Sequence, residues 1–132
     1  MSILHTKLQD ILSNVAADGF GQAMGVIDFD TVCLTIDTAN SANMKIEVFG
    51  TPEDTEPTWA SAQSLTNRYY ELQTVNYDDG DTVDGSTGIT LAGTDTHRYI
   101  EINTNLLSFI NIEISGYAAG NITVSARGCN RG

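Results

Sequence analysis

The chain has 132 residues, a usual length for one domain, and its hydrophobic fraction of 41% allows one compact core. Only 6 residues are Lys or Arg, against 17 that are Asp or Glu, which gives a formal net charge of −11. This balance argues against binding to nucleic acids or to anionic membranes, because both need clustered basic side chains. No run of about 18 apolar residues predicts a transmembrane helix, and no secretory leader is expected at the N-terminus.

An amphipathic helix is predicted at the N-terminus. Five aliphatic residues repeat there at the spacing of one helical stripe: Leu4, Leu8, Ile11, Leu12 and Val15. The glycine-rich segment 19–25 reads as a linker and not as a dinucleotide-binding fingerprint, since no strand precedes it. Residues 1–25 are therefore expected to form an arm. A helix of this length is marginal alone, so its stripe packs either on the same domain or on a neighbouring subunit.

From residue 26 the hydrophobic period changes to two, which is typical of half-buried strands. Segments 26–37 and 44–50 predict a hairpin around a polar turn at 38–43. The segment 51–58 contains both prolines and predicts a loop, because proline cannot donate to a central ladder.

The second half of the chain predicts further strands at 68–75 and 98–104, and the polar stretch 76–96 between them looks like an insertion with one short strand. A hairpin is predicted near the C-terminus, where segments 106–115 and 121–127 flank a turn with glycine. About seven or eight strands without alternating helices predict an all-β fold. We expect an antiparallel β-sandwich or jelly roll over residues 26–132.

Four aspartates of the polar stretch are candidate calcium ligands: Asp78, Asp79, Asp81 and Asp84. Calcium prefers about six to eight oxygen ligands, but the spacing here is not that of an EF-hand, and a solvated loop is the alternative. The two cysteines, Cys33 and Cys129, either form a bridge or remain free thiols.

No catalytic arrangement is recognisable in the sequence. Glu71, Glu101 and Glu113 occupy solvent-facing positions of alternating strands, whereas a glycosidase pair needs an enclosing cleft. His5 and His97 have no Ser or Cys partner in a triad pattern. We therefore expect no enzymatic activity and no cofactor.

Aromatic residues outside the predicted core suggest a binding surface. Tyr69 and Tyr70 are consecutive in a strand, so one should be buried and the other exposed. The candidate patch, which would stack on sugar rings or contact a protein, consists of Trp59, Tyr70, Tyr77, Tyr99 and Tyr117. The alternative is that these rings pack separately at core edges and turns.

The order of strands and turns carries a family resemblance. The features that carry it are Gly50-Thr51 at the end of a strand, Trp59 after the following loop, and Tyr117 with Gly120 in the last turn. Over roughly residues 30–128 the chain is similar to small β-sandwich structural proteins of tailed bacteriophage virions. The resemblance implies a non-enzymatic virion component, such as a head decoration protein, a head-fibre base, or a neck or tail protein.

We therefore predict a virion protein, in the first place a capsid decoration or other head-associated protein, that docks onto the major capsid protein or another virion protein. It would form homo-oligomers, with trimers favoured, through the aliphatic stripe, and would be assembled into the virion in the host cytoplasm. Deleting residues 1–18 is expected to abolish assembly and leave a folded sandwich. The alternative function is a carbohydrate-binding β-sandwich module on a phage fibre or tail.

Overall fold

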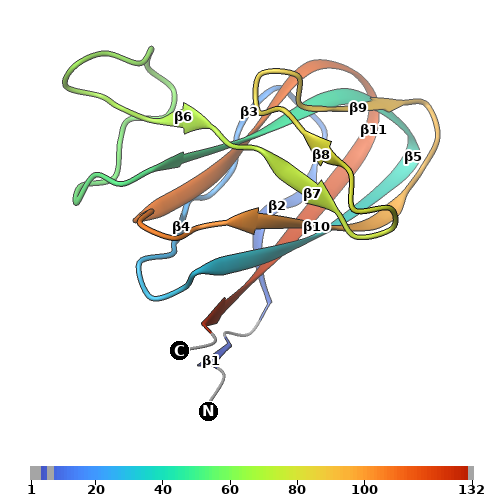
Figure 1. The fold of residues 1–132 in the computed structure, drawn as a ribbon. Helices are drawn as coiled ribbons and strands as arrows, with labels where there is room; N and C mark the ends of the chain where they lie inside the picture. Colours follow the sequence, from blue (N-terminus) through green and yellow to red (C-terminus); the bar gives the residue numbers. More distant parts are fainter. Residues whose placement is uncertain (1–3, 6–7, 131–132) are drawn as a thin grey trace.

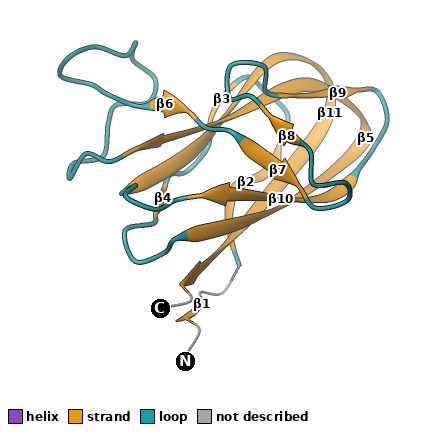
Figure 2. Ribbon diagram, viewed as in Figure 1, coloured by secondary structure: helices purple, strands orange, loops and turns teal. Residues whose placement is uncertain are grey.

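The computed structural model describes residues 4–5 and 8–130, with side chains from residue 8 onward. These residues form eleven strands and no helix (Figures 1 and 2). The strands are β1 Leu4–His5, β2 Gln9–Val15, β3 Gly19–Phe20, β4 Met24–Gly25, β5 Thr31–Thr51, β6 Tyr70–Glu71, β7 Thr74–Asn76, β8 Thr82–Val83, β9 Ile89–Ala92, β10 His97–Asn103 and β11 Phe109–Asn130. The all-β prediction is therefore confirmed for the described part of the chain.

All eleven strands belong to one sheet, and every pairing in it is antiparallel. Its centre is the long ladder between β5 and β11, which runs from the pair Thr51–Phe109 to the pair Thr31–Cys129. On the free side of β11 lie β1 to β4, and on the free side of β5 lie β6, β9 and β10. The assignment to a sandwich or a jelly roll stays a prediction.

Both long strands bend at the middle of their ladder. Asn40 and Ser41 of β5 have φ of 61° and 58°, and Gly116 and Gly120 of β11 have φ of 61° and 79°. The register shifts at the same place, between Ser115 and residue 121. Figure 1 shows that the sheet turns back on itself there, so β10 and β7 lie along one half of the bent ladder and β9 and β6 along the other.

One hydrophobic core lies inside this bend. Alternation along β5 buries Val32, Leu34 and Ile36 before the bend and Met44, Ile46 and Val48 after it, and β11 does the same with its isoleucines. Each fully buried aliphatic side chain of this kind contributes about 1.5–3 kcal/mol relative to an exposed one. The core therefore holds the two halves of the sheet together.

The predicted N-terminal helix is wrong, because residues 9–15 form strand β2, which pairs with β11. The register of that pairing skips twice: Val15 faces Ile122, Leu12 faces Val124, and Asp10 faces Ser125. Such bulges insert extra residues and break the period of two. They leave the adjacent Ile11 and Leu12 only 3% and 1% exposed, and the resulting spacing imitates a helical stripe.

The two predicted hairpins are also wrong. Segments 31–37 and 44–50 are the two halves of β5, and segments 109–115 and 121–127 are the two halves of β11. Each half pairs with the other long strand, because the turn-like residues between the halves bend the strand without reversing it. The strand predicted at 98–104 is confirmed as β10, and the short strand within the polar stretch is confirmed as β9.

The remaining local predictions hold in outline. No named strand occupies residues 52–69, which agrees with the loop predicted at 51–58 except at Thr51, the last residue of β5; an isolated bridge joins Ser64 to Asn67. The predicted strand at 68–75 is divided into β6 and β7, which pair with different strands. No helix in the described residues has the length and apolar character needed to cross a bilayer.

Candidate functional site

A second hydrophobic cluster lies apart from the core and is built from aromatic rings. It consists of buried Phe49, Trp59 and Tyr69, with Phe20 packed against them. Phe49 follows the core residue Val48, so alternation places its ring on the outer face of the sheet. Neighbouring ring centroids in the cluster lie 5.2–5.9 Å apart, within the range of favourable aromatic contacts.

The loop 52–69 is folded back so that Trp59 reaches this face. The side chain of Asn67 closes the loop, accepting a hydrogen bond from Thr58 N at 2.8 Å and donating one to Thr58 O at 2.9 Å. The Tyr69 hydroxyl donates to Ser61 O at 2.7 Å and to Trp59 O at 3.2 Å. Burial, and then the charge of Glu113, raise the pKa of Tyr69, which keeps this hydroxyl a donor.

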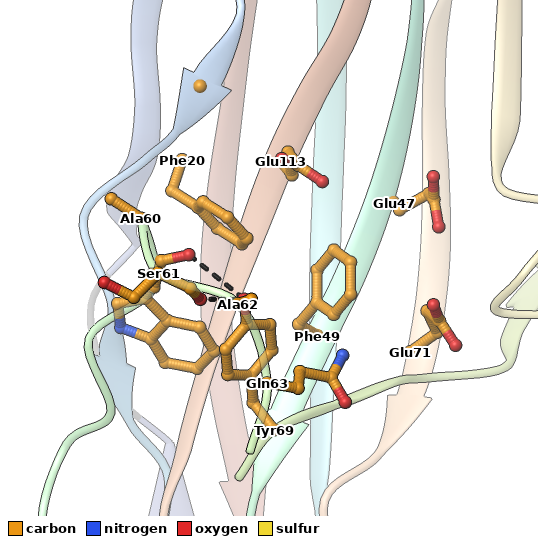
Figure 3. A pocket seen from close by; sticks show the side chains of 12 residues that line it. Phe20, Glu47, Phe49, Ala60, Ser61, Ala62, Gln63, Tyr69, Glu71 and Glu113 are labelled. Carbon is orange, nitrogen blue, oxygen red and sulfur yellow. Dashed lines mark hydrogen bonds between the residues drawn. The ribbon is translucent and has the colours of Figure 1, made fainter. Parts of the chain in front are cut away.

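An open cavity of about 690 Å³ lies against this aromatic cluster. One wall consists of the four rings and the loop segment 60–63, and the other consists of three glutamates (Figure 3). Figure 3 shows Glu113 near Phe20, and Glu47 and Glu71 on the opposite side of Phe49 from Tyr69. We call this the aromatic–carboxylate cavity.

Strand pairing explains why the carboxylates gather here. Glu113 of β11 lies directly opposite Glu47 of β5, and on its other side it faces Phe20 of β3. Glu71 of β6 lies opposite Phe49 of β5, which places it on the same face. Three neighbouring strands thus each contribute one glutamate to the cavity.

The electrostatics of the cavity are unfavourable for its own carboxylates. Like charges directly opposite each other in an antiparallel pair are destabilising. Lys45 Nζ lies 3.2 Å from Glu47 Oε1 and compensates that side chain. Burial, and then the charges of Glu47 and Asp18, raise the pKa of Glu113. The cavity therefore offers hydrogen-bond acceptors and negative charge beside a hydrophobic wall.

The sequence located only part of this site. Trp59 was a candidate, and Glu71 and Glu113 were considered only as a catalytic pair and set aside as exposed strand carboxylates, whereas Phe20, Phe49 and Glu47 were not considered. A signal did exist: Phe49 occupies an outward position of an alternating strand, where a polar residue is usual. The adjacency of the three strands had no local signal, since it depends on pairings between distant segments.

The five residues of the predicted aromatic patch are not brought together. Trp59 is 8% exposed in the cavity wall, while Tyr117 packs against the core and donates its hydroxyl to Gly120 O at 2.9 Å. Tyr70 is exposed on β6, and its neighbour Tyr69 is buried, which confirms that this pair faces opposite sides. Tyr77 and Tyr99 do lie together.

Tyr77 and Tyr99 form an exposed pair on the edge of β10, which we call the tyrosine pair. Their ring centroids lie 6.5 Å apart at an interplanar angle of 34°, and the side chains are 52% and 57% exposed. The backbone fixes their spacing, because Tyr77 N donates to Tyr99 O at 3.2 Å. Asp78 and His97 flank them around a hollow of about 440 Å³.

The four aspartates proposed as calcium ligands lie along two turns. Asp79 accepts a hydrogen bond from Asp81 N at 2.8 Å after β7, and the carbonyl of Asp84 accepts from Thr87 N and Gly88 N at 3.1 Å after β8. Within the described residues, no group of three or more His, Cys, Asp or Glu side chains could hold a metal ion.

The cysteines follow one of the two alternatives left open by the sequence, and the aliphatic stripe differs from its prediction. Cys33 and Cys129 are both free thiols, and burial is the main cause that raises the pKa of Cys33. Of the stripe, Ile11 and Leu12 belong to the core and Val15 packs against it, whereas Leu8 is 52% exposed. The side chain of Leu4, like those of His5 and Arg131, lies outside the described residues.

Solved structures that share this fold include two that each match almost all of this chain. The crystal structure of SPBc2 prophage-derived protein YomS matches with a TM-score of 0.74 and 12% identity over 98% of this chain and 96% of that chain. The crystal structure of PBSX exported protein XepA matches with a TM-score of 0.66 and 16% identity over 98% of this chain and 39% of that chain. No protein-family model and no curated protein matches the sequence. At such identities the likeness shows the fold alone.

Proposed function

We propose that this protein is a structural component of a tailed-phage particle and acts by docking onto other proteins, without catalysis. The observation that supports the proposal most is the match of the whole fold, over 96% of the other chain, with a prophage-derived protein. The resemblance of the strand and turn order to phage structural proteins points the same way. The finer assignment is a capsid decoration or head-associated protein bound to the major capsid protein.

Quantitative mass spectrometry of purified particles tests this proposal. Particles of the phage that encodes the chain are banded on a density gradient, and the chain is counted against the major capsid protein. We expect a fixed ratio in the particle band. A phage-encoded lysis enzyme is the control, because it should stay in the soluble fraction. Recovery of the chain only with that control would contradict a structural role.

The oligomeric part of the proposal has its own measurement. Light scattering of the purified 14.2 kDa chain is expected to give a discrete trimer. Because Ile11 and Leu12 lie in the core, the contact between subunits cannot use the whole aliphatic stripe. Exposed strand edges are the surfaces through which the subunits would pair. A monomer across the measured concentration range would contradict self-assembly and leave docking onto another virion protein in place.

A carbohydrate-binding module on a phage fibre or tail is the second candidate function. The tyrosine pair favours it, since two exposed rings, tilted by 34° to each other, offer faces on which a sugar can stack, with Asp78 and His97 beside them as polar partners. Glycan-array binding should be lost in Tyr99→Ala and kept in Tyr70→Ala, which removes an equally exposed ring elsewhere. Binding that survives Tyr99→Ala would contradict this function.

A further inference from the structure

We propose that the aromatic–carboxylate cavity receives a lysine or arginine side chain of a partner protein. The inference rests on the proposed docking function and names the chemistry of the contact. It joins two features that the fold places side by side: a wall of aromatic rings that includes Phe20 and Trp59, and three carboxylates from three neighbouring strands.

The negative charge of the cavity favours the binding of a cation. Its lining residues include three glutamates and no Lys, Arg or His. The nearby Lys45 is already engaged by Glu47 at 3.2 Å. Glu47 and Glu113 nevertheless stand opposite each other, an arrangement that costs stability unless a positive group lies between or above them. A basic side chain entering from outside would supply that group.

The spacing of the carboxylates suits an organic cation better than a metal ion. Neighbouring strands are about 4.8 Å apart, and Glu71 lies opposite Phe49, two residues along β5 from Glu47, so the three glutamates span more than about 10 Å. No group of three acidic or other metal-binding side chains among the described residues could hold a metal ion. An ammonium or guanidinium group carries several donors, so it can bond to the two directly opposed carboxylates of Glu47 and Glu113 together.

The aromatic wall adds a second attraction for the same group. A cation over a ring face is attracted by the ring quadrupole, and an arginine also stacks on it. Phe20 is half-buried and lies directly opposite Glu113, so ring and carboxylate can contact one side chain together. The aliphatic stem of a lysine or arginine would cover the apolar part of the wall.

An unused hydrogen-bond donor lies in this wall as well. Trp59 is 92% buried, at 8% exposure, and its Nε1 has no hydrogen-bond partner. Buried indole nitrogens usually find a partner. Because this nitrogen is itself shielded from solvent, a carbonyl oxygen of a partner could reach it only if the loop 52–69 moved on binding.

The test is an NMR titration of the full chain with two probes, N-acetyl-arginine methylamide and N-acetyl-lysine methylamide. We expect saturable shifts confined to the amides of the cavity, such as Gly19, Ser61 and Gln63. The citrulline and Nε-acetyl-lysine analogues keep the shape and lose the charge, and they should not produce these shifts. Absence of saturable shifts, or equal shifts with the neutral analogues, would overturn the inference.

Matched variants identify the carboxylates responsible. Glu113→Gln and Glu47→Gln should each weaken binding by about tenfold. Glu101→Gln, a half-buried glutamate of β10 outside the cavity, should leave it unchanged. Equal weakening by Glu101→Gln would show a general charge effect and would also overturn the inference.

This result is independent of the particle measurement. If the titration fails but the chain is found in purified particles, the inference of cation binding is overturned and the proposed virion function is kept. If the chain binds the basic probes specifically but is absent from particles, the inference of cation binding is kept and the proposed virion function is overturned.

Discussion

Glu113 shows how a single side chain can be placed at a cost to the fold. It lies opposite Glu47 in the ladder, and the charge of Asp18 also acts on it. Burial, with these charges, raises its pKa above the ordinary value of 4.5, so the folded state holds the proton more tightly than the unfolded state. The ionised form is therefore the destabilising form.

The first prediction is that Glu113→Gln raises the melting temperature at neutral pH. Above the raised pKa the native carboxylate is ionised and costs stability, whereas below 4.5 it is protonated in both states and the cost vanishes. The advantage of the variant should therefore shrink as the pH falls through this window. Thermal unfolding of both proteins across the acid range measures it, with Glu101→Gln as the control. An advantage that does not change with pH would contradict the assignment.

At the scale of residues, the sequence predicted which face of a strand each side chain occupies, but it did not predict which side chains lie next to each other. Alternation placed Glu71 and Glu113 on the solvent face of their strands, and both do line an outer-face cavity. Their meeting with Glu47 depends on the pairings of β5 with β6 and β11, which join segments far apart in the chain. No local pattern records such a pairing.

At the scale of elements, the bends of β5 and β11 decide the architecture. Asp95 supports the bend in β5, accepting hydrogen bonds from Ser41 N at 3.3 Å and Ala42 N at 3.2 Å. The hydrogen bond from Ala42 N is the main cause that lowers the pKa of Asp95. On the facing strand β11, Gly120 lies against Ala39 and Ala42, which flank the bend residues Asn40 and Ser41. Each bend therefore depends on residues outside its own strand.

The second prediction compares two glycines of the bend in β11. Both have positive φ, but a Cβ on Gly120 would lie 2.4 Å from Ala42 Cα, whereas a Cβ on Gly116 would meet nothing within 4 Å. Gly116→Ala should cost about 1 kcal/mol from backbone strain alone. Gly120→Ala should cost roughly 3 kcal/mol or more, since the neighbouring backbone must also move. Urea unfolding measures both, and equal costs would contradict the close packing of the two bends.

Turn-like residues explain why two hairpins were predicted where two bent strands exist. Polar residues and glycines at 38–43 and 116–120 favour positive φ, which serves a hairpin turn and a strand bend equally. Which one forms depends on the partner: here the two strands bend at the same point of their shared ladder. In β2, bulges produced the spacing of a helix for a similar reason, because inserted residues shift the period.

At the scale of the whole molecule, the N-terminal strands complete the sheet. Strands β2, β3 and β4 pair in turn along the outer side of β11, and Ile11, Leu12 and Met24 enter the same core as the strands of the second half. Composition allowed one core and the series of strand patterns predicted an all-β fold, but the inclusion of this segment in the sheet was not predictable from its pattern. The described part of the segment is therefore a layer of the fold itself.

The third prediction distinguishes a strand of the core from a separate helical arm. Leu8 and Leu12 would lie on one stripe of the predicted helix, yet in β2 and the residue before it they are 52% and 1% exposed. Leu12→Ala should cost about 2–5 kcal/mol, as large-to-small changes in cores do, and Leu8→Ala should stay within about 0.5 kcal/mol. Deleting residues 1–18 removes β2 and uncovers Ile122 and Val124, so the truncated chain should lose cooperative unfolding. Near-ultraviolet circular dichroism with thermal melting measures all three. If the truncated chain unfolds cooperatively like the full chain, and the two alanine variants have equal effects, the segment would be a separate arm and not a strand of the core.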